Sequence, residues 1–498
     1  MPDSERWDLE FDVVVAGYGY AGAMAAIAAH DAGRNVGIFE KMPHFGGNSI
    51  LSGGSVVVAH EYEPVLKYLR RTTMDTTDDD VLQAFARGMV ELPGLLSRLA
   101  GDVGFEIMPS RDGPTYPFEG GEALYCVHVT RNEKYQGFPW AKGTKAGGTL
   151  FWVMAENVAR RDIDVRYESP VRELVQDADG SVRGVVVEAD GRALRVAARR
   201  AVVLATGGFE HNERMRLHYL QIQNTSAMSP LGNTGDGIMM AQKAGAALWH
   251  MWHVHGGYGF RIPGLPVAVR HSWPGFRDVN RRMPWIALDR FGHRFMDEYP
   301  PAPQDTGMRP LEYYDPDIQD YPRIPSHLVY DEEARKVGPI GSFKSNDENI
   351  NFEWSDDNLR EVEAGYIERA NTLEELAEVL GIDSESLVES VERWNRFCQE
   401  GVDRDFRRPP GTMMPITTPP FYTIEAWPII TNTQGGPVHS ARQQIVDPFG
   451  AAIPRLYAAG EMGSLFGHLY LLAGNNAECL IGGQVAGRNA AAEAPWSG

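Results

Sequence analysis

Three glycines and one glutamate near the N-terminus stand at spacings that matter chemically. Gly17, Gly19 and Gly22 follow a short β-branched apolar run, and Glu40 ends a second apolar run. In a βαβ unit the first glycine permits a tight turn, the second lets a pyrophosphate approach the backbone, and the third lets the helix pack on the strand. The helix N-terminus then attracts phosphates. A carboxylate at Glu40 suits the two hydroxyls of an adenosine ribose, so the pattern predicts a dinucleotide without a 2′-phosphate.

The elements that position these residues can be outlined from the hydrophobic pattern. Residues 11–16 read as a strand, 23–33 as an alanine-rich helix and 35–40 as a second strand. Asp-Gly turns within 171–205 divide short strands, which is typical of a β-meander returning to the sheet. The last residues, from 455 onward, read as a strand, a glycine turn and a terminal helix. These elements predict an α/β fold.

Composition argues against several classes of protein. Lys and Arg number 47 against 67 Asp and Glu, a net charge of −20, which is the wrong sign for binding nucleic acid. The three cysteines, Cys126, Cys398 and Cys479, form no CxxC pair, so we expect reduced thiols in a cytoplasmic protein. The apolar segment 13–29 is too short and glycine-rich for a membrane span, and the first residues lack the features of an export signal.

Four separated blocks carry a resemblance to a known family. They are the glycine turn with Glu40, the segment 46–54, the Ala-Thr-Gly-Gly sequence at 205–208, and Gly460-Glu461 with the terminal helix. Together they resemble the flavoproteins of fumarate reductase and succinate dehydrogenase, a group that also contains the 3-ketosteroid dehydrogenases. A nicotinamide enzyme would explain the first block alone. The resemblance therefore implies FAD.

The resemblance also implies a division of the chain. Residues 1–258 and 428–498 would form a discontinuous Rossmann-like FAD-binding domain of the glutathione-reductase type. Residues 259–427, which are broken by prolines and rich in aromatics, would form an inserted α+β substrate and catalytic domain that matches the family only around 292–298.

The family's cofactor contacts carry over to positions in both ends of the chain. Residues 46–49 would line the pyrophosphate and isoalloxazine, and Glu461 would reach ribityl or ribose hydroxyls. Amides near Asn475 and Asn476, at the positive end of the terminal helix, would face the flavin and stabilise its reduced anion. The FAD-binding residues so expected are Gly17, Gly19, Ala21, Gly22, Glu40, Lys41, Gly46, Gly47, Asn48, Ser49, Ser52, Gly53, Gly54, Val171, Ala205, Thr206, Gly207, Asp236, Gly460, Glu461, Asn475 and Asn476.

The resemblance indicates how FAD is attached, and the pattern of histidines bears on a metal site. Family members that attach FAD covalently use a histidine in the block after the second strand, where this chain has Asn48-Ser49. We therefore expect noncovalent FAD. Histidines 250, 253 and 255 lack a nearby carboxylate or cysteine partner in the sequence, so no metal site is expected.

The arginines and histidines with which the family's dicarboxylate reductases grip their substrate are largely missing. Asn432 stands where those enzymes have histidine, and Tyr299 with prolines follows Arg294 where their proton-donating arginine would lie. Two carboxylates leaving water need charge-assisted partners. A dicarboxylate substrate is therefore disfavoured, although Arg309 and Arg323 keep it open.

Tyr470 and Gly474 have the spacing of the residues that donate a hydroxyl and an amide to the ketone oxygen in ketosteroid dehydrogenases. Such donors make the neighbouring C–H removable because they stabilise the developing enolate. The intervening residues 471–473 are Leu-Leu-Ala, where those enzymes favour proline and glycines. The loop between Tyr470 and Gly474 is therefore not expected to copy the backbone geometry of those enzymes in every detail.

In the ketosteroid group a tyrosine of the inserted domain takes the proton, and here Tyr299, Tyr313 and Tyr314 are the candidates. Tyr299 ranks first because it lies nearest the slot of the reductases' arginine. A phenol with a pKa near 10 needs help to act as a base, which Arg294 or Arg309 could supply. His255 lies near the family's substrate-facing histidine. With Trp252, Tyr258 and Trp273 it is expected to form an aromatic wall around a hydrophobic substrate.

These residues predict an FAD-dependent oxidoreductase that dehydrogenates, or reduces, the carbon–carbon bond α,β to the ketone of a steroid or other cyclic ketone. A fumarate-reductase-like enzyme acting on an unsaturated carboxylate is the second hypothesis, and a flavoprotein electron-transfer subunit the third. The expected partners are a small hydrophobic ketone and an electron acceptor that the sequence does not name. Nucleic acid is not expected, and a homo-oligomer is left open.

Overall fold

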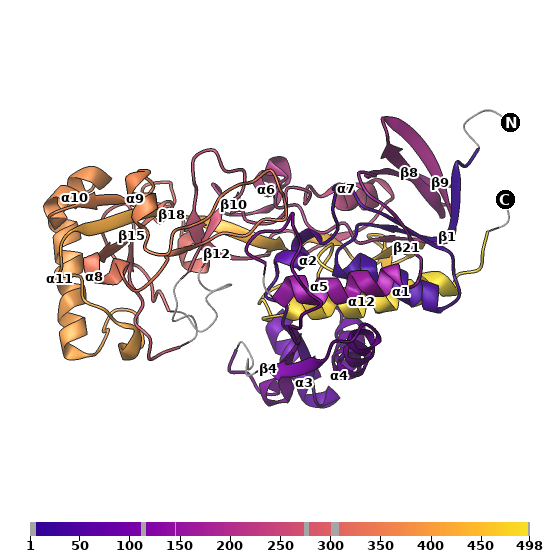
Figure 1. The fold of residues 1–498 in the computed structure, drawn as a ribbon, viewed down its shortest axis with the longest axis horizontal. Coiled ribbons are helices and arrows are strands. Elements are labelled where there is room, and N and C mark those ends of the chain that lie inside the picture. The colour runs from indigo at the N-terminus through magenta and orange to yellow at the C-terminus, as the bar shows by residue number, and fades with distance from the viewer. Residues whose placement is uncertain (1–5, 111–115, 145, 273–277, 300–307, 497–498) are drawn as a thin grey trace.

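A parallel sheet forms the centre of one half of the molecule, seen at the right of Figure 1. The computed structural model describes residues 6–110, 116–144, 146–272, 278–299 and 308–496. Val13 of β1 pairs with Val36 of β2 and with Ala201 of β9, and all three are buried. The parallel strands, in spatial order, are β6 (Asp164–Arg166), β2 (Val36–Phe39), β1 (Leu9–Ala16), β9 (Arg192–Leu204) and β21 (Ala452–Ala458). This order reverses direction beside β1, which is where α/β sheets bind ligands.

Helices cover one face of this sheet, with a small three-stranded sheet beyond them (Figure 1). Helices α1 and α12 approach closely because α12 has glycine where they meet: a Cβ on Gly487 would lie 2.2 Å from the carbonyl oxygen of Ala25. The elements are α1 (Tyr20–Asp31), α2 (Gly47–Leu51), α3 (Tyr62–Thr73), α4 (Asp79–Asp102), α5 (Ala146–Ala159), α12 (Gly474–Ala492), β3 (Val56–Ala59), β4 (Ile107–Ser110) and β5 (Leu124–Val129). The βαβ unit and the terminal helix predicted from the sequence are thus confirmed.

The meander expected within 171–205 forms an antiparallel extension of the same sheet. Strand β8 pairs with both β7 and β9, and β20 pairs antiparallel with β21. Two short helices follow the meander and lead toward the other half of the molecule (Figure 1). The elements are β7 (Val171–Gln176), β8 (Val182–Ala189), α6 (Glu213–Tyr219), α7 (Asp236–Lys243) and β20 (Gln444–Val446).

A second, mostly antiparallel sheet runs through the other half, and a group of helices closes its far end (Figure 1). Its long strand β18 pairs with β12, β15, β17 and, in parallel, with β10. The strands are β10 (Ser226–Ala227), β12 (Val254–Phe260), β13 (Val269–His271), β14 (Ile286–Leu288), β15 (Ser326–Asp331), β16 (Gly341–Ser342), β17 (Glu368–Ala370) and β18 (Phe421–Thr433). The helices are α8 (Glu332–Arg335), α9 (Leu359–Glu363), α10 (Leu373–Leu380) and α11 (Ser384–Glu400).

The boundaries expected at 259 and 427 fall inside β12 and β18, not in linkers. The two strands pair antiparallel in the second sheet, with Gly259 opposite Trp427. A short ribbon of β11 (Leu248–Trp249) and β19 (Gly436–Pro437) lies just before β12 and just after β18. The two halves are therefore joined by paired strands, and the division into two domains stays a prediction.

A buried cluster of ion pairs stabilises the second half. Glu298 contacts Arg294 at 2.7 Å and Arg408 at 3.3 Å, and Arg294 also contacts Asp403 at 2.9 Å. Arg408 is 1% exposed and donates to the carbonyl oxygens of Met283 and Trp285 as well. The guanidinium of Arg294, expected from sequence to assist a tyrosine base, is thus engaged by two carboxylates that hold the chain together.

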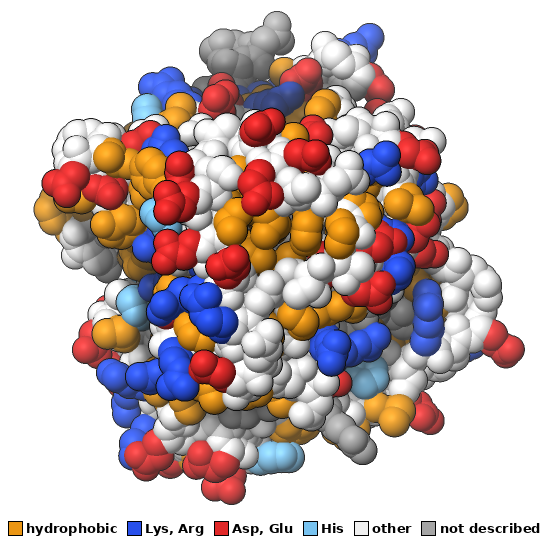
Figure 2. All heavy atoms as spheres, turned by 90° about the vertical axis from the view of Figure 1, so that its left-hand side faces the viewer, with side chains coloured by type: hydrophobic (Ala, Val, Ile, Leu, Met, Phe, Trp, Pro, Cys, Tyr) orange, Lys and Arg blue, Asp and Glu red, His pale blue; other side chains and the backbone are white. Residues whose placement is uncertain are grey.

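The outer face of the second half carries side chains of both charges. Figure 2 shows acidic and basic groups interspersed over that face, with apolar side chains between them. In the part of the chain that the structure describes, no helix combines the length and the apolar character needed to cross a membrane.

Candidate active site

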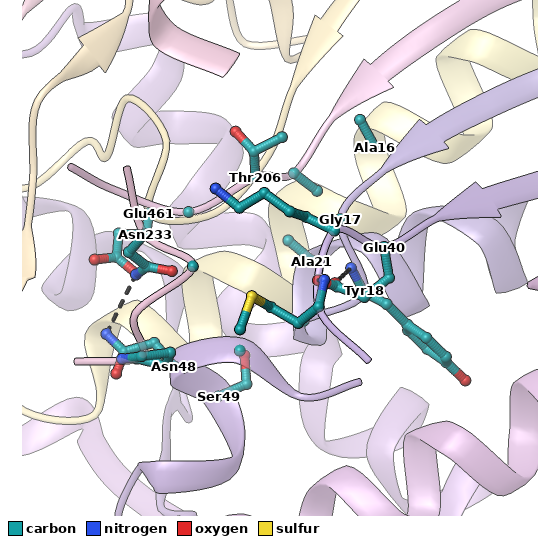
Figure 3. A pocket seen from close by; sticks show the side chains of 18 of the residues that line it. Ala16, Gly17, Tyr18, Ala21, Glu40, Asn48, Ser49, Thr206, Asn233 and Glu461 are labelled. Carbon is teal, nitrogen blue, oxygen red and sulfur yellow. Dashed lines mark hydrogen bonds between the residues drawn. The ribbon is translucent and has the colours of Figure 1, made fainter. Parts of the chain in front are cut away.

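A cavity opens where β1 gives way to α1, at the point where the strand order reverses. Figure 3 shows Glu40 beside Tyr18 at one end of this cavity and Asn48 facing Glu461 at the other. We call it the cofactor cavity. Its lining is Ala16, Gly17, Tyr18, Gly19, Tyr20, Ala21, Phe39, Glu40, Lys41, Met42, Gly47, Asn48, Ser49, Pro170, Val171, Ala205, Thr206, Gly207, Pro230, Gly232, Asn233, Asp236, Ala459, Glu461 and Cys479.

The turn between β1 and α1 requires glycine at two positions. Gly17 has a φ of +99°, and a Cβ there would lie 2.4 Å from the carbonyl oxygen of Ala205. A Cβ on Gly22 would lie 2.0 Å from the carbonyl oxygen of Gly17. Gly19 directly precedes α1, so the N-terminus of the helix borders the cavity that Gly19 lines. The tight turn, the close helix packing and the anion-attracting helix end all suit a pyrophosphate.

Glu40 secures the end of the cavity beside β2. Its carboxylate accepts hydrogen bonds from the backbone N–H groups of Tyr18 and Met42, both at 2.8 Å. Burial raises the pKa of Glu40, while these two donors oppose the rise. Lys41 continues this edge and contacts Asp236 at the start of α7, at 2.9 Å. The expected ribose-binding acid therefore lies in the cavity wall, in a position set by the turn it closes.

The opposite end is built by α2 and the segment after β21. Ser49 accepts a hydrogen bond from the N–H of Tyr20 at 2.9 Å, which ties α2 to α1. Asn48 donates to the carbonyl oxygen of Thr431 at 2.8 Å and to Glu461 at 3.5 Å. Glu461 is 7% exposed, and its Oε1 has no hydrogen-bond partner among the described residues. A buried acceptor left open to a cavity suits a ligand that brings hydroxyl groups, as the ribityl chain of FAD does.

Some expected cofactor residues shape the cavity without lining it. Gly22, Gly46, Gly54 and Gly460 are absent from its described lining, and the last three have positive φ values of +113°, +73° and +80°. Four further expected residues lie next door, in a second cavity: Ser52, Gly53, Asn475 and Asn476.

This second cavity, of about 620 Å³, has the size of a small-molecule site. We call it the substrate cavity. It shares Asn48, Ser49, Glu461 and Cys479 with the cofactor cavity, so the two are contiguous. Its lining is Asn48, Ser49, Leu51, Ser52, Gly53, Ser55, Met228, His255, Arg270, His271, Ser272, Ser342, Lys344, Thr431, Asn432, Glu461, Tyr470, Leu472, Ala473, Asn475, Asn476 and Cys479.

Tyr470 and His255 lie face to face in the wall of the substrate cavity. Their ring centroids are 3.6 Å apart and their planes differ by 5°. Nδ1 of His255 lies 3.1 Å from Oδ1 of Asn432, so it donates to that oxygen and its orientation is fixed by β18. Gly474, the expected second donor, is buried and does not belong to the described lining of the cavity. Its amide donates to the carbonyl oxygen of Leu471 at 2.7 Å. The structure thus brings Tyr470, and not the Gly474 amide, to the cavity.

The start of α12 is held by a buried hydrogen-bond network. Nδ2 of Asn475 donates to Oε1 of Gln434 at 3.0 Å and contacts Glu478 at 3.4 Å. Glu478 also accepts from the hydroxyl of Ser464 and the N–H of Leu465. Burial raises the pKa of Glu478 to about 8. The amides expected to face the flavin are therefore positioned by side chains from two other segments.

The three candidate tyrosine bases fall in different places. Tyr313 and Tyr314 are each 44% exposed; Tyr313 lies against Arg323, and the hydroxyl of Tyr314 donates to Gln319. These two do not line the substrate cavity. Tyr299 is half-buried and packs against a hydrophobic core cluster that extends through both halves, but it is absent from the described lining. It directly precedes residues 300–307, including Pro300, which lie outside the described residues.

The expected aromatic wall does not form from the described residues. Trp252 is 42% exposed and lines a separate small pocket with Arg309. Tyr258 is buried, stacks on His271 and accepts a hydrogen bond from the indole of Trp285. Trp273 lies outside the described residues. The expectation was wrong for Trp252, which lies in a turn before β12, and for Tyr258, which lies three residues after His255 in β12. Side chains alternate between the two faces of a strand, so Tyr258 and His255 point to opposite sides.

Several side chains at the site were missed by the sequence patterns. Arg270 and Lys344 line the substrate cavity from β13 and from the residues after β16, while Arg309 and Arg323 lie elsewhere. Glu210, fully buried, lies against Glu461. A signal for Glu210 was present, because it lies two residues after the Ala-Thr-Gly-Gly block. Arg270 and Lys344 belong to no motif, and only the strand pairing brings them to the cavity.

Comparison with known proteins identifies the chain's family. The family model described as FAD binding domain matches residues 12–477. The chain belongs to this family. This FAD binding domain protein is therefore an FAD-dependent oxidoreductase related to fumarate reductases and ketosteroid dehydrogenases, and the predicted cofactor is confirmed as FAD. No group of three or more potential metal ligands occurs among its described residues.

The relatives of this FAD binding domain protein include both enzyme types expected from the sequence. The urocanate reductase of Eggerthella lenta is 27% identical over 492 residues, 97% of this chain and 75% of that protein. The 3-oxosteroid 1-dehydrogenase of Mycolicibacterium smegmatis is 28% identical over 550 residues, 93% of each chain. The solved 3-ketosteroid Δ1-dehydrogenase of Sterolibacterium denitrificans, in complex with 1,4-androstadiene-3,17-dione, has a TM-score of 0.83 at 22% identity and covers 97% of this chain and 99% of its own. That likeness confirms the predicted fold.

Proposed function

We propose that this oxidoreductase introduces or removes a carbon–carbon double bond next to a ketone, in a substrate bound beside Tyr470. The observation that carries the proposal is the contact between the two cavities: Asn48, Ser49 and Glu461 belong to both walls. A substrate in the second cavity therefore lies next to the cofactor in the first. Bound FAD supplies the acceptor or donor of the hydride.

Tyr470 would make the C–H bond beside the ketone removable. A phenol O–H that donates to the ketone oxygen stabilises the developing enolate, an effect worth about 3 kcal/mol per donor in such sites. The stacked ring of His255, itself anchored on Asn432, holds Tyr470 in the wall. Because the amide of Gly474 already donates to Leu471, the proposal gives the donor role to Tyr470 alone.

The proton would be taken by Tyr299. Tyr313 and Tyr314, the two alternatives, are exposed and lie outside the cavity lining. Tyr299 is the candidate that is partly buried against a hydrophobic core cluster. A Tyr299→Phe enzyme that keeps its flavin and its turnover would remove this assignment.

A second candidate function is favoured by the charges in the cavity. Arg270 and Lys344 line it together with the hydroxyls of Ser272 and Ser342. Cationic side chains with hydroxyl neighbours suit a carboxylate. An unsaturated carboxylic acid as the substrate of a reductase is therefore the alternative, and relatives named urocanate reductase and fumarate reductase are similar to this chain.

Anaerobic flavin spectroscopy separates the two candidates. The oxidised enzyme mixed with saturated 3-ketosteroids and simpler cyclic ketones should lose its visible flavin absorbance, and the chemically reduced enzyme should not be reoxidised by fumarate or urocanate. The reverse pattern would move the unsaturated acids to first place. Arg270→Gln serves as the matched variant, because it should weaken the response to acids and leave the response to uncharged ketones.

A further inference from the structure

Two buried carboxyl groups meet at the boundary between the cofactor and substrate cavities. Glu210 follows β9 and is fully buried, whereas Glu461 follows β21 and is 7% exposed. A Cβ added to Gly208 would lie 2.8 Å from Oε1 of Glu210 and 2.9 Å from Oε1 of Glu461. Both carboxyl groups therefore lie close to Gly208, where a larger residue would place a side-chain atom against them.

Few donors serve these two acids. Oε1 of Glu210 accepts a hydrogen bond from the N–H of Thr433 at 2.8 Å, and Oε2 of Glu461 accepts one from Asn48 at 3.5 Å. Asn432 also contributes to Glu461. The remaining oxygens, Oε2 of Glu210 and Oε1 of Glu461, are buried without a hydrogen-bond partner among the described residues. Two carboxylate anions in such a place would be poorly solvated.

The groups that face the pair favour one charge, not two. Burial and the neighbouring Glu210 raise the pKa of Glu461 well above its usual range. Arg216 of α6 acts electrostatically on Glu210, and so does His211, whose own pKa is lowered by burial. On the other side Glu461 faces Cys479 of α12, and burial raises the pKa of that thiol. Adjacent carboxyl groups of this kind lose their protons in two separate steps that belong to the pair.

We propose that Glu210 and Glu461 share one proton, and that this shared proton couples FAD binding to pH. Glu210 is a positioning residue: it keeps the proton on the pair, while Glu461 is the member that reaches the cavity. When the shared proton leaves to solvent, the pair gains a second negative charge beside a cavity that must hold an anionic dinucleotide. Affinity for FAD then falls as pH rises. The inference depends on FAD binding alone and not on the proposed substrate.

The proton balance follows from this arrangement. Below the second ionisation of the pair, FAD binds without net proton exchange at this site. Above it, the free pair has lost its shared proton, so binding FAD takes up one proton from solvent. The affinity should then fall as much as tenfold for each further pH unit.

Titration of the apoprotein with FAD tests the proposal. The dissociation constant, followed by quenching of flavin fluorescence from about pH 6 to about pH 10, should rise with pH in the wild type. In Glu210→Gln a single carboxyl group remains and the second negative charge cannot form, so the constant should rise less with pH than in the wild type. Glu213→Gln is the matched control, since Glu213 is an exposed acid of α6 that also acts on Arg216.

Calorimetry gives a second readout that needs no variant. FAD binding measured at alkaline pH in two buffers of different ionisation enthalpy should show uptake of up to one proton by the wild type. Zero uptake across the range, or equal pH slopes in wild type and Glu210→Gln, would overturn the proposal. If Glu210→Gln fails to fold, the proton count of the wild type alone decides.

Discussion

Tyr470 is the residue on which the proposed chemistry depends most directly. Its ring is fixed by His255, so Tyr470→Phe should keep the packing and remove only the O–H donor. Turnover with a ketone should fall on the order of a hundredfold, because one donor to the forming enolate is lost. FAD content should barely change. The measurement is kcat with the flavin content of each preparation, together with exchange of the ketone's α-protons in deuterated water.

The control for Tyr470 is Tyr314→Phe, which removes an exposed hydroxyl bonded to Gln319. It should leave both turnover and exchange unchanged. A Tyr470→Phe enzyme that still exchanges α-protons at the wild-type rate would remove the enolate role and favour the unsaturated acids.

Glu40 is the second residue with a separable role. Its carboxylate accepts two backbone hydrogen bonds that shape the turn between β1 and α1. Glu40→Ala leaves the buried N–H of Tyr18 and the part-buried N–H of Met42 without their acceptor. The loss at the buried donor costs about 1–3 kcal/mol. FAD loading should drop, while turnover per bound flavin stays at the wild-type value. Equal loss of per-flavin turnover would place Glu40 nearer the substrate than proposed.

At the scale of elements, the ion cluster around Glu298 links separate segments of the second half. Glu298 accepts from the N–H of Ala287 in β14 and pairs with Arg294 and Arg408, each buried. Glu298→Gln leaves two buried guanidinium groups with less compensation, and breaking such a pair costs about 3–5 kcal/mol. Urea denaturation should show that loss. Glu400→Gln, which removes an exposed pair with Arg404, should cost under about 0.5 kcal/mol.

At the scale of the whole molecule, the cofactor cavity draws on segments from both ends of the chain. Its lining runs from Ala16 to Cys479, so FAD should stabilise the fold as a unit. Binding adds about 2.7 kcal/mol at a free FAD concentration of one hundred times Kd. The Tm of the apoprotein should rise steadily with added FAD and stay unchanged with NAD⁺.

Acid precipitation should leave the yellow colour in solution, and colour retained by the pellet would contradict noncovalent binding.

Local patterns in the sequence were sufficient for the nucleotide-binding half of the site. The strand, turn and helix around Gly17 and Gly22, and the acid Glu40, lie within one βαβ unit of consecutive residues. Hydrophobic periodicity and glycine spacing indicate such a unit directly. The fold class and the FAD cofactor could therefore be predicted from these residues and the family they resemble.

Only the tertiary structure decided what surrounds the substrate. Tyr470 contacts His255, which lies 215 residues earlier in the chain. Glu461 lies against Glu210, which is 251 residues earlier. Whether Arg270 enters the cavity or Tyr313 stays outside it depends on the register of β13 and on how the second half packs. A shift of one residue turns a strand's side chains to the opposite face, so spacing along the chain cannot determine which of them reach a common cavity.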